Sequence, residues 1–192
     1  FEGRTSNKAE MRDVDGVLYC NDGDWVDIWD ITGLPGRRGM RKVARDMIEI
    51  ALRADGVPPG PKIYEVLSSP GGWDRAFNKL SQLKKDVKVW YDSASQSVTL
   101  LQTGEADVLP AYNARAQVAI DSGAPVSVSW NGAFYSLVGW TIPRGNPKAD
   151  IARRFIQYCA RADRQAAWTT ALTNGPTNPG AYKFIAEKRA RA

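Results

Sequence analysis

The chain has 192 residues, of which 43% are hydrophobic. This length and composition exclude a disordered chain and allow one large core or two small lobes. Its formal net charge is +5, but acidic residues interleave with the lysines and arginines, which is typical of solvated helix faces and argues against a nucleic-acid-binding domain. There is no histidine, which excludes Ser-His-Asp and Cys-His catalysis and histidine-based metal hydrolysis, so we expect no enzyme activity and no cofactor.

Helical and extended patterns alternate in the first half of the chain. Residues 24–30 are predicted to form a short helix, and a strand over 37–41 leads into a helix over 42–54. Residues 58–61 are predicted to form a loop, and the next helix opens at Gly72 or Asp74. The apolar stripe of that helix comprises Trp73, Ala76, Phe77, Leu80 and Leu83.

The second half continues the alternation and then becomes helical. Strands are predicted over 87–91, 106–111, 126–130 and 135–142, and helices over 93–102, 113–121, 148–159, 163–172 and 181–190. Buried side chains are expected at Val98 and Leu101 in one helix. In the helix over 148–159 they are expected at Ile151, Ala152, Phe155, Ile156 and Cys159.

This alternation predicts an α/β fold with a mostly parallel sheet flanked by helices. Ligands of such sheets bind beyond the carboxyl ends of the strands. That rule selects three turns as candidate sites, at residues 41–45, 91–96 and 112–117.

The turn at 91–96 places two hydroxyls and an amide, from Ser93, Ser95 and Gln96, at the start of a helix. Backbone N–H groups at such a position attract an anion such as a carboxylate. Capping of the helix by Asp92 or Ser93 is the alternative role.

The other two turns carry an aromatic ring, an amide and two fixed cations. Tyr112 is suited to stacking on a ligand or on an ammonium group, and Asn113 and Arg115 follow it. Arg41 is suited to pairing with a carboxylate through two hydrogen bonds. The structural alternatives are a rim tyrosine with Asn113 as helix N-cap, and a surface arginine.

Six short motifs are collinear with those of a known family. They are DWVDIWD at 24–30, LPGRRGM at 34–40, the helix at 73–83, LLQTGEAD at 100–107, WTIPRG at 140–145 and GPTN at 175–178. In this order they resemble the polyamine-type family of bacterial extracellular solute-binding proteins, the relatives of the spermidine/putrescine-binding protein.

The resemblance implies a periplasmic-binding-protein-like fold of type II, with two lobes that close on a ligand. It assigns residues 1–23 to an incomplete N-terminal or hinge segment and 24–131 to the second lobe. Residues 132–192 would form the return crossing and the C-terminal helices, partly belonging to the other lobe. Most of the first lobe would precede Phe1. The implied role is that of the periplasmic binding component of an ABC importer, a monomer that delivers its ligand to a membrane permease.

The chain departs from the family where polyamine binders grip ammonium groups with acidic side chains. The two acidic positions at the start of the helix over 42–54 correspond to Val43 and Asp46. The acidic position of the return crossing corresponds to Val138, and the family's stacking tryptophan corresponds to Tyr112.

Fewer acids beside Arg41 and Arg115 favour a ligand with a carboxylate, such as an amino acid or a γ-aminobutyrate-like compound, over a polyamine. The expected ligand contacts are Arg41, Asp46, Ser93, Ser95, Gln96, Tyr112, Asn113, Arg115 and Tyr135.

Two other classes stay open, namely an enzyme built on the same two-lobe fold and a basic nucleic-acid-binding domain. The two cysteines, Cys20 and Cys159, form no CxxC pair. Burial as two small apolar side chains is favoured over one disulfide.

Overall fold

The computed structural model describes residues 11–14, 17–20 and 24–190. The chain divides into two compact units, Phe1–Ala133 and Phe134–Ala192. Strands β1 (Met11–Val14) and β2 (Val17–Cys20) pair antiparallel near the start of the first unit.

A short parallel sheet is the centre of the first unit. Strands β3 (Arg38–Arg41) and β4 (Val87–Tyr91) lie side by side, and Arg38 also bridges in parallel to Val108. The strand predicted over 106–111 is reduced to this single bridge. Pro110 accounts for part of the shortening, because it has no N–H to donate to a ladder. The parallel α/β arrangement that the alternation predicted is thereby confirmed.

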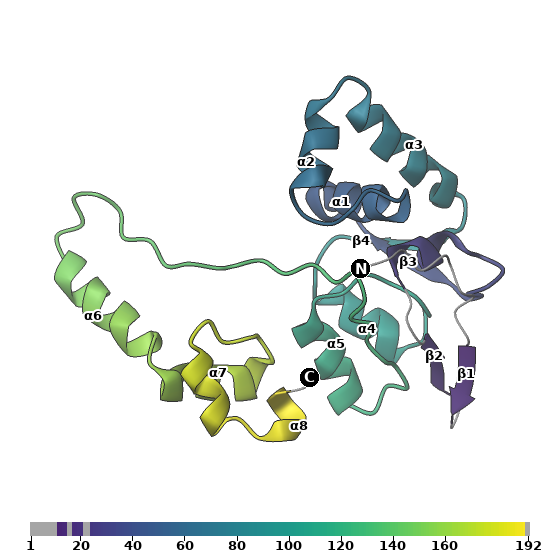
Figure 1. Cartoon of the computed structure of the whole chain (residues 1–192). Helices are drawn as coiled ribbons and strands as arrows, with labels where there is room; N and C mark the ends of the chain where they lie inside the picture. Colours follow the sequence, from purple (N-terminus) through teal and green to yellow (C-terminus); the bar gives the residue numbers. More distant parts are fainter. Residues whose placement is uncertain (1–10, 15–16, 21–23, 191–192) are drawn as a thin grey trace. The chain divides into compact units, whose positions relative to one another are not determined.

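Helices cover both faces of this sheet (Figure 1). On one side lie α1 (Ala44–Ala54), α2 (Pro61–Ser68) and α3 (Gly72–Lys84), and on the other lie α4 (Gln96–Gln102) and α5 (Asn113–Asp121). All but α2 were expected from the apolar spacing. A proline at the first helical position is favourable, so α2 begins within what was predicted to be a loop.

The short 3-10 helix η1 (Trp25–Trp29) lies where a helix was expected and begins with a complete capping box. The Asp24 carboxylate accepts a hydrogen bond from the Trp25 N–H at 2.6 Å, and Asp27 Oδ2 accepts one from the Asp24 N–H at 2.7 Å. The Trp25 indole donates to the carbonyl of Gly132 at 2.6 Å. The end of the first unit is thus fastened to its first helix.

The core of the first unit consists of apolar clusters on both sides of the sheet. Met40 of β3 packs with Met47 and Ile50 of α1, and Tyr91 of β4 packs with Leu100 of α4. A further cluster joins the three helices of the first side, made by Ile48, Leu52, Val57, Ile63 and Ala76.

Burial within two predicted helices differs from the prediction. On α3, Ala76 and Leu83 are buried, but Trp73 and Phe77 are 52% and 53% exposed because the apolar stripe is wider than the face that meets α1. On α4, Ser97 and Leu100 are buried, whereas Val98 and Leu101 were expected inside. Because α4 begins at Gln96 and has only two turns, the turn before it, and not its own apolar spacing, decides which of its side chains face the core.

The second unit contains α6 (Ala149–Cys159), α7 (Ala162–Leu172), the 3-10 helix η2 (Pro179–Phe184) and α8 (Glu187–Ala190). The helix predicted over 181–190 is therefore interrupted, with Ile185 in an extended conformation.

The predicted burial of α6 is wrong. The helix has the strongly one-sided apolar pattern that led to the expectation, yet none of its residues is buried, and Ile151 and Phe155 are 64% and 51% exposed. Cys159 is a free thiol and is only half-buried, contrary to the expectation of a buried one. The side chain of Cys20 lies outside the described part of the chain.

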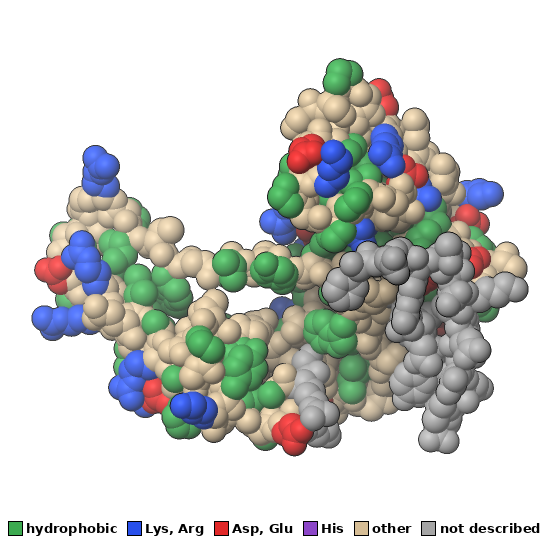
Figure 2. Space-filling model, in the orientation of Figure 1, with side chains coloured by type: hydrophobic (Ala, Val, Ile, Leu, Met, Phe, Trp, Pro, Cys, Tyr) green, Lys and Arg blue, Asp and Glu red, His purple; other side chains and the backbone are tan. Residues whose placement is uncertain are grey.

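Residues 126–130 and 135–142, both described throughout, form no strand although their side chains alternate. The predictions there are wrong because alternation fixes which way side chains point but supplies no neighbouring strand. Several apolar side chains in the second segment are largely exposed as a result, including Leu137 and Val138. Hydrophobic side chains lie on the surface of the extended stretch that precedes α6 (Figure 2).

Among the described residues, no helix is both long and apolar enough to cross a membrane.

Candidate ligand-binding site

Three chain segments end at one edge of the parallel sheet. Arg41 is the last residue of β3 and pairs with Tyr91, the last residue of β4. Val108 bridges to β3 on its other side, and Tyr112 follows four residues later. Because parallel strands present their carboxyl ends at the same edge, the three predicted turns converge there.

Arg41 and Tyr112 are the centre of this convergence. The Arg41 guanidinium donates to the Tyr112 hydroxyl at 2.9 Å and lies 5.1 Å from the centroid of the tyrosine ring. Its Nε also lies 3.5 Å from the carbonyl oxygen of Asp92. The arginine side chain is only 19% exposed, so the fold holds its cation in place while a small part of the side chain stays accessible.

Asp46 brings a negative charge into the same cluster. It lies in the first turn of α1, where the helix dipole favours a carboxylate. One carboxylate oxygen is 3.4 Å from Arg41 Nη1, and the other accepts from Arg45 Nε at 3.1 Å. The hydrogen bond that Arg45 donates to Asp46 raises the pKa of the Arg45 guanidinium.

The loop between β4 and α4 is closed by its own polar groups. The Gln96 amide oxygen accepts from the N–H groups of Asp92 and Ser93 at 2.8 and 2.9 Å. The hydroxyls of Ser93 and Ser95 lie 2.9 Å apart and are exposed. Two of the three predicted contacts in this loop therefore present hydroxyls to solvent, while the Gln96 oxygen is used within the loop.

The start of α5 supplies the remaining predicted contacts of the first unit. Tyr112 occupies the N-cap position, so the alternative role of Asn113 as N-cap is wrong. Arg115 is exposed, and its side chain makes no hydrogen bond or ion pair with any residue that the structure describes. Its charge is thus available to an anionic ligand.

Tyr135 belongs to the second unit, where it is 90% exposed. The other eight predicted residues belong to the first unit, within or directly after its three predicted turns.

Two residues of the site were not predicted. Tyr91 is buried, and its hydroxyl donates to the carbonyl oxygen of Pro110, which ties the third segment to β4. Burial raises the pKa of this phenol, so it stays a neutral donor. Lys42 pairs with Asp92 across the strand ends at 3.3 Å. Both residues lie within the turns predicted at 41–45 and 91–96, and this position was the signal that could have identified them.

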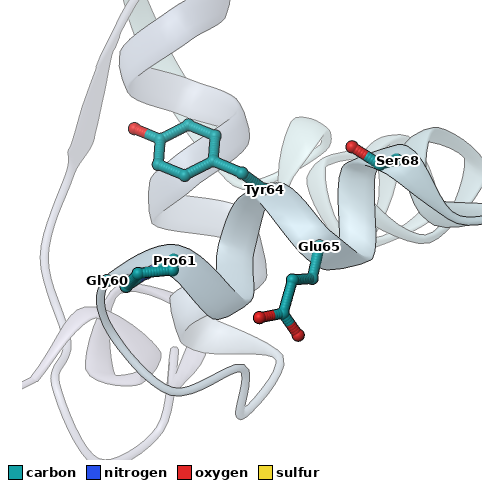
Figure 3. Close-up of a pocket in the computed structure, with 5 residues that line it drawn as sticks. All are labelled: Gly60, Pro61, Tyr64, Glu65 and Ser68. Atoms are coloured by element: carbon teal, nitrogen blue, oxygen red, sulfur yellow. The ribbon is translucent and has the colours of Figure 1, made fainter.

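A separate surface hollow of about 550 Å³ lies along α2 (Figure 3). It is lined by Gly60, Pro61, Tyr64, Glu65 and Ser68. It is wide open, lined by one helix and the loop before it, and contains none of the predicted contacts. The convergence of charged and aromatic side chains at the sheet edge is the stronger candidate site.

Comparison with known proteins identifies the family. The profile of the bacterial extracellular solute-binding protein family matches residues 7–192. A curated relative, the gamma-aminobutyric acid-binding protein of Pseudomonas aeruginosa, is 34% identical over 161 residues, which are 84% of this chain and 45% of the relative.

Solved structures show the same fold. A structure described as the Atu4243-GABA receptor superposes with a TM-score of 0.73 at 31% identity, covering 92% of this chain and 53% of that one. An ABC transporter substrate-binding protein from Bradyrhizobium japonicum superposes with a TM-score of 0.71 at 32% identity, covering 89% and 52% of the two chains. The expected type of periplasmic-binding-protein fold is confirmed.

The chain spans about half the length of the curated relative that it matches. The family is extracellular, which agrees with the predicted periplasmic location. The match over nearly the whole chain shows that the protein belongs to the bacterial extracellular solute-binding proteins.

Proposed function

We propose that this protein is the ligand-capturing component of an ABC importer and that it takes a small ligand carrying both a carboxylate and an amino group, such as γ-aminobutyrate. The observation that carries the proposal is the Arg41 guanidinium, held by the Tyr112 hydroxyl and ring at the carboxyl edge of the sheet. A fixed guanidinium matches the geometry of a carboxylate, and the exposed tyrosine ring offers a face for the rest of the ligand.

The charge balance of the cluster supports an anionic group on the ligand. Lys42, Arg45 and Arg115 stand with Arg41 at this edge, against the two carboxylates of Asp46 and Asp92. A net positive edge attracts a carboxylate and repels a polycation. Asp46 contacts Arg41 and Arg45, and its carboxylate has lone pairs beyond those two contacts with which to accept a hydrogen bond from the amino group of the same ligand.

The relatives support the same ligand class. One is named for binding gamma-aminobutyric acid and another structure is described as a GABA receptor. Within the family, we propose that this chain descends from the polyamine-type scaffold and has exchanged its ammonium-binding acids for a carboxylate site.

Calorimetric titration tests the proposal directly. We expect γ-aminobutyrate to bind and the diamine putrescine to bind at least tenfold more weakly. Arg41→Gln should weaken γ-aminobutyrate binding by roughly 30-fold or more, since a charge-assisted contact to the ligand is lost.

Arg75→Gln is the matched control for this variant. Arg75 is also an arginine paired to an aspartate, Asp55, but it contacts the opposite end of α1. It should leave the affinity unchanged. Tighter binding of putrescine than of γ-aminobutyrate by the unaltered protein would refute the assigned ligand class.

We further propose that the protein works as a monomer with a membrane permease as partner, binds no nucleic acid and does not turn its ligand over. Mass spectrometry of the ligand recovered after long incubation should show it unchanged. A conversion product would favour the enzyme alternative, and a salt-sensitive shift of DNA or RNA would favour the nucleic-acid alternative.

A further inference from the structure

Asp46 is shared unequally between two arginines. Its Oδ1 accepts from Arg45 Nε at 3.1 Å, while its Oδ2 lies 3.4 Å from Arg41 Nη1. Arg41 has its shorter contact with the neutral Tyr112 hydroxyl, at 2.9 Å. The carboxylate therefore binds more closely to the arginine that is not at the centre of the site.

We infer that Arg45 is a positioning residue that determines ligand specificity by engaging Asp46 and so leaving Arg41 free for the ligand's carboxylate. This inference rests on the proposed function. Arg41 and Asp46 alone would be a neutral pair, and a ligand carboxylate would have to compete with Asp46 for the guanidinium. With Arg45 added, the three side chains carry one net positive charge.

The surroundings of Arg45 keep it directed at Asp46. Glu49 lies one turn further along α1 and is the other carboxylate within reach of Arg45 on this helix. Its Oε1 already accepts a hydrogen bond from the Tyr64 hydroxyl of α2 at 2.8 Å. Lys42, the next cation at this edge, pairs instead with Asp92. Asp46 is thus the nearest acid for Arg45, at hydrogen-bonding distance.

Arg45 itself has no structural role in the core. Its side chain is 72% exposed, so replacing it should not affect folding. Arg45→Gln removes the charge and keeps a helix-forming residue at the second position of α1. We expect this variant to bind γ-aminobutyrate about three- to tenfold more weakly and putrescine more tightly than the unaltered protein does. Arg45→Lys, which keeps the charge, should bind nearly as well as the unaltered protein.

Arg75→Gln is the matched control, because it also removes an exposed arginine that is paired with an aspartate, Asp55, without touching Asp46. It should change the affinity by less than about twofold. Equal losses from Arg45→Gln and Arg75→Gln would mean that only the overall charge matters, and would overturn the inference.

A double-mutant cycle with Asp46→Asn tests whether Arg45 acts through Asp46. In the Asp46→Asn background, Arg45→Gln should change γ-aminobutyrate affinity by less than about twofold. The same loss in both backgrounds would overturn the inference while leaving the proposed function intact. Failure of the unaltered protein to bind γ-aminobutyrate would instead refute the proposed ligand, and this inference with it.

Discussion

Two adjacent arginines show how differently one residue type can be used. Arg37 is half exposed and pairs with Asp107, whose pKa it holds below the ordinary value by hydrogen bonding. Arg38 is 1% exposed and forms no ion pair with a carboxylate of the residues that the structure describes. Its guanidinium donates instead to the backbone carbonyl oxygens of Ile28, Asp30, Leu34 and Gly36. Arg38 therefore fastens η1 and the following loop to the sheet.

Replacing Arg38 should be costly. Arg38→Met would leave several buried carbonyl oxygens without donors, and we expect a loss of about 3 kcal/mol in the free energy of unfolding, measured by urea denaturation. Arg37→Met is the neighbouring control and should lose less than about 1 kcal/mol, because its ion pair is solvent-exposed. Equal losses in the two variants would contradict the assigned role of Arg38.

At the scale of elements, the packing of α2 against α3 depends on a glycine. Gly72 is the first residue of α3 and is buried. A Cβ built on it would overlap the backbone carbonyl of Val66 in α2, whose carbon atom would lie only 2.7 Å away. A backbone carbonyl within a helix cannot move aside as a flexible side chain does, so the two helices approach this closely only because the residue has no side chain.

Gly72→Ala should accordingly destabilise the protein although alanine favours helices. We expect a loss of about 2 kcal/mol or more in thermal unfolding experiments, as the overlap forces α2 away from α3. Asn78→Ala, at an exposed position of the same helix, should be neutral or slightly stabilising. A stable Gly72→Ala variant would show that the contact is looser than described.

At the scale of the whole molecule, the two units differ in how much they bury. The first has apolar clusters on both sides of its sheet. In the described part of the second, the buried apolar cluster consists of Ala166, Ala181 and Ile185. Large side chains such as Trp140 and Phe155 pack edge to face with centroids 5.2 Å apart, yet both are more than half exposed.

Expressed separately, the two units should behave differently. Residues 1–133 should unfold cooperatively on heating, whereas 134–192 should be helical but show no sharp transition, since a buried cluster of two alanines and one isoleucine cannot offset the entropy of ordering the segment. Circular dichroism melting curves would distinguish the two, and dye binding should report exposed apolar surface on the second. A cooperative transition in 134–192 would contradict this expectation.

Much of the candidate site could be predicted because the carboxyl ends of parallel strands lie at one edge of a sheet, whatever the exact positions of the side chains. Once β3, β4 and the segment at Val108 were recognised as parallel, their following turns had to meet at one edge. The rule therefore predicted Arg41, Ser93 and Tyr112 as ligand contacts. The role of Arg45 was missed, because nothing in its spacing distinguishes an exposed helical arginine from many others.

Periodicity in the sequence determined where most helices and the two parallel strands lie, since local spacing reflects backbone geometry. Periodicity wrongly predicted strands at 126–130 and 135–142, because a strand also requires a neighbouring strand to pair with. It wrongly predicted burial in α6, because an apolar helix face is buried only where another element packs against it. No local pattern contains either partner. Tertiary structure alone decided that Asp46 is shared between Arg41 and Arg45, and that Gln96 closes its own loop. Such pairings depend on side-chain positions set by the packing of α1, α4 and α5 around the sheet.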